Sequence, residues 1–293
     1  MSLRKILSLQ DFEHAARRRL PRSVFGFVAG GAEDARSLRD SRDAFDDFAL
    51  RPRVLIDVSK RSQGISLFGR RYASPFGIPP MGASALCWFE ADLALARAAC
   101  AADVPFILSA PSAVPLERVI REAPGAWYQA YLPAGRERIA SLLDRVRAAG
   151  FEVLVVTLDV PVGANRENNL RNGFNMPVRL NARLALDGLL HPRWLFGTLA
   201  RTLLRSGIPR FENFGAERGG WIISTPPGGQ HAGREHACEY ALKDRVLAME
   251  VKGVIADCAA PMSFGFLRCM SVRDGRHGCP WLRTAPCVNF TLV

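Results

Sequence analysis

Short apolar segments alternate with amphipathic ones from Pro75 onward, and this alternation constrains the fold more than any other feature of the chain. Apolar residues at Ile139, Leu142, Leu143 and Val146 have the spacing of one helical face. We expect strands at 76–78, 104–109, 127–132 and 153–158, separated by helices at 91–102, 115–122 and 136–149. This alternation predicts a parallel sheet, either doubly wound or closed as a (β/α) barrel. No G-x-G-x-x-G motif follows the first strand, which argues against a dinucleotide-binding Rossmann fold.

Length and charge narrow the class of protein further. The chain has 293 residues, enough for one large α/β domain or two small ones. It contains no run of apolar residues long enough to span a membrane, and its polar N-terminus does not resemble a signal peptide, so we expect a cytoplasmic protein. The net charge is +11, but the arginines are scattered and do not form a block interleaved with aromatic residues. We therefore expect no nucleic-acid partner, since anionic lipid or a carboxylate substrate explains local arginine clusters equally well.

The cysteines indicate neither a metal site nor a disulfide framework. There are seven of them, and five follow residue 237. No C-x-x-C motif and no Cys/His spacing typical of zinc sites is present. Without a signal peptide, structural disulfides are not expected.

The segment 20–59 carries the most specific information. It predicts a helix leading into a Gly30-Gly31 turn, a second helix opened by the acidic pair Glu33-Asp34, and a basic extended run at 51–53. This string resembles the N-terminal segment of the FMN-dependent 2-hydroxy-acid dehydrogenases and oxidases, the family of glycolate oxidase, L-lactate dehydrogenase and (S)-mandelate dehydrogenase. The resemblance continues to about Phe214. It implies an FMN-type (β/α)8 TIM barrel with an N-terminal helical cap that ends after about the fifth strand, which we place at 251–255.

The resemblance assigns the FMN contacts to the carboxyl ends of successive strands, where (β/α) barrels place their working groups. The backbone N–H of Gly82 would approach the flavin N5, and Gln129 would hydrogen-bond the pyrimidine edge. Lys252, in the sequence VKGVI, would lie near N1 and O2, where a cation stabilises reduced flavin. The complete set of cofactor-binding residues implied by the resemblance is Met81, Gly82, Ala83, Ser109, Gln129, Thr157 and Lys252.

The same resemblance implies four residues around the substrate. Tyr131 would hold the substrate oxygen, and Asp159 would orient a catalytic histidine. Arg166, in GANRENNLRNGF, would clamp the substrate carboxylate with its guanidinium fork. Phe27 takes the place of a substrate-facing tyrosine. Taken singly, each residue at a strand end has an ordinary structural explanation. The occurrence of these residues at the ends of four successive strands, in the order of the family, favours the functional explanation: Met81-Gly82-Ala83, Ser109, Gln129 with Tyr131, and Thr157 with Asp159.

The chain also departs from the family pattern. It lacks the S-N-H-G-G-R-Q motif of the catalytic histidine and the D-G-G-x-R-R-G segment that holds the FMN phosphate. Met81 replaces a threonine, and Asn172-Gly173-Phe174 replaces Asn-Arg-Phe. The resemblance implies FMN-dependent oxidation of an L-2-hydroxy acid to the 2-oxo acid by hydride transfer to flavin. The missing motifs support an alternative, a non-catalytic truncated fragment or pseudoenzyme of this family.

The segment 175–210 interrupts the alternation with leucines, Trp194 and six arginines against one acid, Asp187. This composition fits an interfacial amphipathic segment, or a surface helix pair that packs on the barrel or on a neighbouring subunit. The strings LDGLLHPRW and GIPRFENF resemble the membrane-docking insertion of mandelate and lactate dehydrogenases. They imply peripheral attachment to the inner face of the cell membrane, access to a quinone-type electron acceptor, and a homo-oligomer for the intact fold.

The sequence divides into two parts. Residues 1–256 are expected to form the FMN hydroxy-acid dehydrogenase domain. Residues 257–293 show no periodicity and few acidic residues, with Cys, Arg, Pro and Trp scattered among them. We interpret them as an atypical tail outside the barrel, either a disordered extension or sequence read out of frame.

Overall fold

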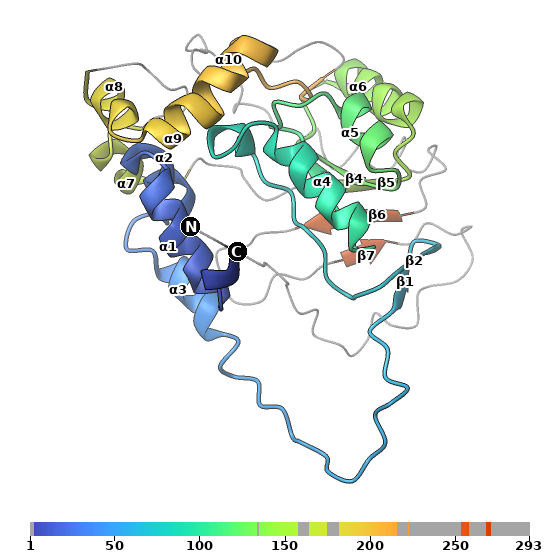
Figure 1. Ribbon diagram of the computed structural model, residues 1–293. Coiled ribbons are helices and arrows are strands. Elements are labelled where there is room, and N and C mark those ends of the chain that lie inside the picture. The colour runs from blue at the N-terminus through green and yellow to red at the C-terminus, as the bar shows by residue number, and fades with distance from the viewer. Residues whose placement is uncertain are drawn as a thin grey trace.

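A half-open barrel wall beside a helical cap makes up the computed structural model (Figure 1). The structure describes residues 3–133, 135–157, 164–174, 182–215 and 222, together with strands at 253–257 and 268–270. The wall contains the sheet and the helices α4, α5 and α6, whereas the N-terminal helices lie together with α7 and α8. The two parts are connected through the segment 44–64.

The sheet has the strand order of a partial barrel. Its neighbouring strands are β3 (Ile107–Ser109), β4 (Trp127–Ala130), β5 (Val153–Thr157), β6 (Gly253–Asp257) and β7 (Arg268–Met270). β3 to β6 pair in parallel, as the βα alternation predicts. The first predicted strand is reduced to a parallel bridge between Ile78 and Phe106, which places it beside β3. β7 runs antiparallel to β6, so the order of a (β/α) barrel stops after the fifth position.

One face of the sheet is covered by helices. These are α4 (Ala91–Ala101), α5 (Leu116–Glu122) and α6 (Arg136–Ala149), and the limits of α6 are those that the periodicity predicts. Ile139, Leu142, Leu143 and Val146 are buried on α6, in one cluster with Tyr128 of β4. The apolar stripe of α6 therefore packs on the wall, and Tyr128 points to the helical side as expected from strand alternation.

The opposite face is closed at the amino ends of the strands. The hairpin β1 (Ile65–Leu67) and β2 (Arg70–Tyr72) packs against Trp127, Val153 and Val155. The Trp127 indole N–H donates a 3.0 Å hydrogen bond to the Tyr72 hydroxyl. Because the hairpin fills this end of the wall, the carboxyl ends of the strands are left for a site.

The N-terminal cap begins with η1 (Leu3–Lys5) and consists of the helices α1 (Leu9–Arg19), α2 (Arg22–Ala29) and α3 (Arg36–Asp43). The helix predicted before Gly30 is confirmed and ends there, where Gly30 donates its N–H to Gly26 O, but Gly30 itself is extended and the turn lies at 32–35, where the Ala35 N–H donates to Ala32 O at 2.8 Å. The acidic pair does not open the next helix, and that expectation is wrong. Glu33 and Ala35 have positive φ angles of 48° and 54°, so the chain turns there and the helix begins at Arg36.

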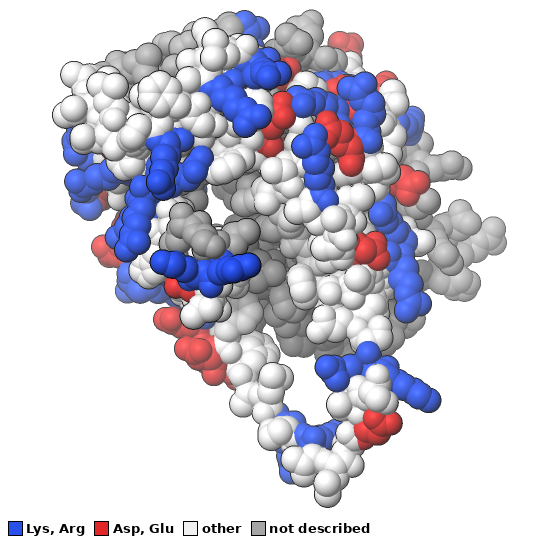
Figure 2. All heavy atoms as spheres, in the orientation of Figure 1, with Lys and Arg blue, Asp and Glu red and all other residues white. Residues whose placement is uncertain are grey.

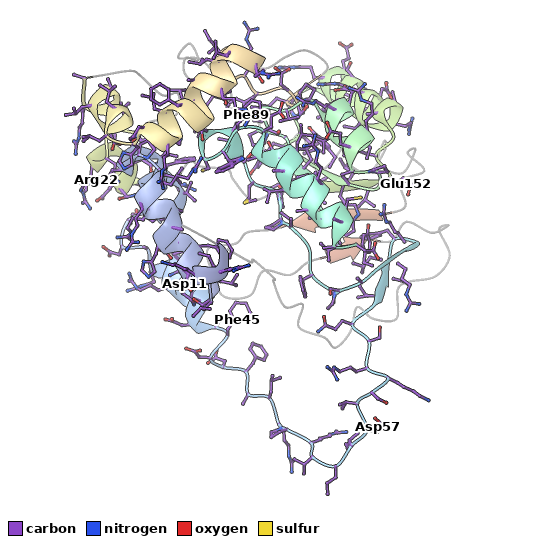
Figure 3. All side chains as sticks on the ribbon, in the orientation of Figure 1. Asp11, Arg22, Phe45, Asp57, Phe89 and Glu152 are labelled. Atoms are coloured by element: carbon purple, nitrogen blue, oxygen red, sulfur yellow. The ribbon has the colours of Figure 1, made fainter. Side chains whose placement is uncertain are left out.

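A long segment that contains no helix and no strand, residues 44–64, projects away from the rest of the chain (Figure 3, near Phe45 and Asp57). It includes the predicted basic run at 51–53, and that run is extended as expected. The side chains of Leu50, Val54 and Leu55 are at least 79% exposed, so this segment contributes little to the core.

The insertion is helical and packs on the cap. It forms α8 (Ala182–Leu189), α9 (Pro192–Trp194), a π-helical turn (Leu195–Ala200) and α10 (Arg201–Ser206). Trp194 is buried with Leu20, Val24 and Phe174, and its indole N–H donates to Leu86 O at 2.7 Å. The face of the insertion that carries Trp194 therefore packs on the protein, as expected for a surface helix pair. Trp194 is buried there and is unavailable to a membrane.

Asp187 of α8 provides the N-terminal cap of α2. Its carboxylate accepts backbone N–H groups of Arg22 and Ser23, each at 3.0 Å, and the Ser23 hydroxyl at 2.9 Å. Arg22 lies beside α8 in Figure 3. Burial alone would raise the pKa of Asp187, but these hydrogen bonds outweigh it and lower the pKa below the ordinary value of 3.8.

Replacing Asp187 with alanine should lower the free energy of unfolding by about 1–2 kcal/mol near neutral pH, because the first turn of α2 loses its cap. A carboxyl whose folded pKa is lowered stabilises the fold above its ordinary pKa, and this contribution disappears as the pH falls through the folded pKa. Urea unfolding at about pH 7 and about pH 3 should show a smaller difference at the lower pH. The exposed Asp144→Ala on α6 is the control. An equal loss in both variants would contradict the capping role.

Candidate functional site

Three polar residues form a hydrogen-bonded row across the carboxyl ends of β3, β4 and β5. The Ser109 hydroxyl donates to Gln129 Oε1 at 2.9 Å, and Gln129 Nε2 donates to Thr157 Oγ1 at 2.8 Å. The Ala110 backbone N–H also donates to Gln129 Oε1, at 3.3 Å. These bonds fix the orientation of the amide. The second N–H of Gln129 and the hydroxyl proton of Thr157 can still be donated to a ligand.

The low exposure of this hydrogen-bonded row is unusual for polar side chains. Ser109 is 3% exposed and Gln129 is 2% exposed, while Thr157 is half-buried. Buried polar side chains are costly unless they are hydrogen-bonded, so a satisfied row at a strand edge suits a polar ligand rather than packing alone. The structure thus brings together three of the predicted cofactor residues.

The loop of Met81, Gly82 and Ala83 lies against the loop that follows β3. The backbone N–H of Ala83 donates to Pro111 O at 2.9 Å. A Cβ at position 82 would lie 2.9 Å from Cγ of Pro111, so this close approach itself requires glycine, independently of any ligand. Met81 is 40% exposed. The loops predicted to contact FMN at the ends of the first and second strands therefore lie next to each other.

Asp92 supports the loop that follows β3, and sequence reasoning missed it. This carboxyl is 2% exposed and accepts a 2.6 Å hydrogen bond from the Ser112 hydroxyl. Burial raises its pKa, against the opposing effect of the Ser112 and Ser84 hydroxyls. Ser112 Oγ also accepts the backbone N–H of Val114 at 3.0 Å. Asp92 is part of the first turn of α4, where an acid is ordinary, so the sequence gives no signal of this role.

Phe27 and Arg166, both predicted substrate residues, lie together. The Arg166 guanidinium carbon is 5.8 Å from the centre of the Phe27 ring, which packs 4.8 Å from Phe174. Arg166 precedes α7 (Glu167–Arg171), and Asn168 of this helix donates to Gly26 O at 2.6 Å. The docking of α7 on α2 therefore places an exposed guanidinium on an aromatic face. Within the described stretches, no hydrogen bond joins this pair to the Ser109 row.

The remaining predicted residues are placed only in part. Tyr131 follows β4, is half-buried and packs against the core cluster of the helical face. Asp159 and Lys252 lie outside the described residues. Their roles, and the orientation of Tyr131 toward a substrate, stay predictions.

Hydrogen bonds of Asn213 hold in place the segment that follows the insertion. This buried amide accepts the Leu116 N–H and donates to Val114 O, both at 2.9 Å, while its backbone carbonyl accepts the Tyr128 hydroxyl. Arg145 adds a forked ion pair with Glu117, with N–O distances of 2.7 and 3.0 Å. The loop after β3 is thus tied to the end of the insertion.

Known proteins resemble this chain in sequence. Residues 16–250 match the family described as FMN-dependent dehydrogenase. (S)-Mandelate dehydrogenase of Pseudomonas putida is 36% identical over 210 residues, which cover 71% of this chain and 52% of that protein. L-Lactate dehydrogenase of Alcaligenes faecalis is 34% identical over 209 residues, which cover 70% of this chain and 55% of that protein. The chain spans about half the length of these relatives.

Solved structures agree with the sequence matches. The crystal structure of the monotopic membrane protein (S)-mandelate dehydrogenase has a TM-score of 0.65 and 33% identity, covering 82% of this chain and 60% of that one. A mandelate oxidase variant with a C4a-OH-FMN adduct has a TM-score of 0.54 and 36% identity, covering 59% of this chain and 51% of that one. The fold is that of the FMN-type (β/α) barrels. The chain belongs to the FMN-dependent dehydrogenase family.

Proposed function

We propose that this chain forms the flavin-edge and substrate-carboxylate part of an FMN-dependent dehydrogenase that oxidises an L-2-hydroxy acid to the 2-oxo acid. The observation that carries the proposal is the buried Ser109–Gln129–Thr157 row at the carboxyl ends of three parallel strands. Its amide and hydroxyl donors fit the carbonyl oxygens on the pyrimidine edge of a flavin. When bound, FMN would supply the hydride acceptor.

The other residues have separate tasks in this proposal. The exposed Arg166 guanidinium binds the substrate carboxylate, and Phe27 beneath it keeps the fork in place. Tyr131 donates its hydroxyl to a substrate oxygen, and Asp159 holds the base in its working orientation. The loop of Met81, Gly82 and Ala83 borders the flavin ring, and Lys252 stabilises negative charge on it.

The motif that carries the general base in the resembled family is missing from this sequence. None of the five histidines lies in the S-N-H-G-G-R-Q context that the resemblance gives to the base. This absence supports the alternative function, a non-catalytic fragment or pseudoenzyme. We propose residues 1–256 as the dehydrogenase part and 257–293 as an atypical tail, and note that the family match ends at residue 250.

Flavin binding tests the proposal directly. Because the row contacts the ring edge and the sequence lacks the phosphate-holding motif, riboflavin and FMN should bind weakly and with similar affinity. Thr157→Val keeps the side-chain shape and removes a donor, so it should weaken both affinities by about fivefold, the value of one net hydrogen bond. Quenching of flavin fluorescence measures both dissociation constants.

The exposed Ser141→Ala serves as the control for the flavin experiment and should leave both affinities unchanged. A strong preference for FMN over riboflavin would show that a phosphate site exists. Unchanged flavin affinity in Thr157→Val would remove the row from the proposed site.

The outer face of the insertion supports peripheral membrane attachment. Apolar side chains there are 42–86% exposed: Leu186, Leu189, Leu190, Phe196, Leu203, Leu204 and Ile208. Figure 2 shows uncharged residues gathered over α8 to α10, with arginines beside them. No helix within the described stretches is long and apolar enough to cross a bilayer. We propose that this face lies on the inner surface of the cell membrane, where a quinone accepts the electrons, and that the intact fold is a homo-oligomer.

Replacing Arg193, Arg201 and Arg205 together with glutamate should abolish binding to anionic vesicles. Each arginine near an anionic surface contributes roughly 1 kcal/mol, so reversing three charges should weaken binding by more than about 100-fold. Vesicle co-sedimentation of the full chain measures the effect, and added salt should weaken wild-type binding.

The matched control for this charge reversal is the triple glutamate variant of Arg42, Arg71 and Arg138, which are exposed on other elements. It changes the net charge equally but leaves the insertion intact. Equal losses in both triple variants, or equal wild-type binding to neutral and anionic vesicles, would favour a packing or subunit role for the insertion.

A further inference from the structure

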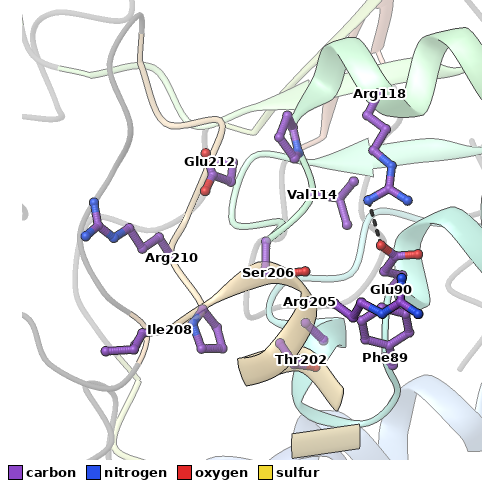
Figure 4. Close-up of a pocket in the computed structure, with 14 residues that line it drawn as sticks. Phe89, Glu90, Val114, Arg118, Thr202, Arg205, Ser206, Ile208, Arg210 and Glu212 are labelled. Carbon is purple, nitrogen blue, oxygen red and sulfur yellow. Dashed lines mark hydrogen bonds and ion pairs between the residues drawn. The ribbon is translucent and has the colours of Figure 1, made fainter. Parts of the chain in front are cut away.

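We propose that a cavity of about 260 Å³ beside α10 binds the phosphodiester headgroup of one monoanionic membrane lipid. The inference rests on the proposed membrane attachment and adds a defined site to it. One wall consists of Thr202, Arg205 and Ser206 of α10, and the chain continues around the cavity through Ile208 and Pro209. Figure 4 shows the cavity between α10 and the start of α4 and α5.

The α10 residues reach the cavity because of their spacing. Positions 202, 205 and 206 are three and four residues apart, so they share one face of the helix. Thr202 is 6% exposed and donates its hydroxyl to Thr198 O at 2.7 Å, which anchors this face. Arg205 is exposed and points along the cavity near Phe89 in Figure 4. A guanidinium at the opening of a cavity is well placed to donate two hydrogen bonds to a phosphate.

The charges of the lining select a single negative charge. Arginines 118, 205 and 210 face glutamates 90 and 212, which leaves one net positive charge. Arg118 and Glu90 form a 2.6 Å ion pair, and this bond to Glu90 raises the pKa of Arg118. A phosphodiester carries one negative charge, which balances the net positive charge of the lining. A phosphomonoester dianion would meet the two carboxylates with a second negative charge and be disfavoured.

Apolar surface continues from the cavity toward the proposed membrane face. Ile208 lines the cavity and is 50% exposed, and it belongs to the apolar outer face proposed to meet the membrane. Val114, Pro115 and Pro209 supply apolar lining within the cavity. A ligand with an anionic head and an acyl chain can therefore place the head between Arg205 and Arg118 and the chain along Ile208. This continuity favours a lipid over a free anion.

Short-chain lipids separate headgroup binding from vesicle attachment. Dihexanoyl phosphatidylglycerol, kept below its micelle concentration, should bind the full chain saturably with one site by calorimetry. Dihexanoyl phosphatidylcholine and inorganic phosphate should bind at least about tenfold more weakly, since one lacks net charge and the other carries more than one. Arg205→Gln should weaken phosphatidylglycerol binding by about tenfold or more. Arg138→Gln on α6, exposed and outside the cavity, should leave it unchanged.

Each other outcome has a definite meaning. Equal binding of phosphatidylglycerol and phosphatidylcholine, or an unchanged affinity in Arg205→Gln, would overturn the inference. Inorganic phosphate binding as tightly as the lipid would replace it with a general anion site. If vesicle binding fails while saturable short-chain binding is retained, the proposed attachment is wrong and the site stands. If vesicle binding occurs without saturable short-chain binding, the site alone is wrong.

Discussion

The chain as printed should show no measurable oxidation of lactate or mandelate, even with excess FMN. A positioned general base is worth about 10²–10⁴-fold in rate, and the sequence offers no histidine in the corresponding motif. Weak flavin binding should reduce turnover further, because the phosphate-holding motif is also absent. Substrate-dependent reduction of a dye by the purified protein measures this directly.

The positive control for turnover is (S)-mandelate dehydrogenase of Pseudomonas putida, of which the matched region covers 52%. Robust oxidation by the present chain would mean that another residue supplies the base. The first candidates to replace would then be the histidines at 14, 191, 231, 236 and 277. Loss of activity on replacing one of them would identify the base, and the pseudoenzyme alternative would be wrong.

Replacing Asn213 with leucine should lower the free energy of unfolding by about 2–5 kcal/mol, because two buried backbone groups lose their partners. These groups are the N–H of Leu116 and the carbonyl of Val114, and Asn213 itself is completely buried. Urea unfolding followed by circular dichroism measures the change. The exposed Asn165→Leu is the matched control and should stay within about 0.5 kcal/mol of wild type. Similar small changes in both variants would show that water or side-chain rearrangement replaces the lost bonds.

Local periodicity explains why much of the fold could be predicted from sequence. The apolar stripe of Ile139, Leu142, Leu143 and Val146 predicts a helix independently of its tertiary contacts. The limits of α6 follow from this stripe. Strand alternation likewise places Trp127 and Tyr128 on opposite faces, as observed. The row at the strand ends was predictable for the same reason, since parallel strands bring their carboxyl ends to one edge.

Contacts between distant segments could not be predicted in this way. Asp92, Asp187 and Asn213 act on partners that no local pattern identifies, and α8 caps a helix 164 residues away. Trp194 appeared suited to an interface by composition, but its N–H finds a carbonyl inside the cap. The charge of Glu33 predicts that a helix starts there. The positive φ angles of the backbone at Glu33 and Ala35 instead delay the start of α3 to Arg36.

The cap formed by Asp187 also limits how this protein can be recombined with its relatives. Asp187 of the insertion caps the N-terminus of α2 by accepting hydrogen bonds from Ser23. The insertion and the N-terminal segment would therefore have to be exchanged together. A chimera that takes its insertion from another protein but keeps this N-terminus would leave the first turn of α2 uncapped, unless the donor also supplies an acid there. Phe27 and Gly26, on that same helix, contact Arg166 and Asn168. Altering the insertion would thus also shift the residues proposed to bind substrate.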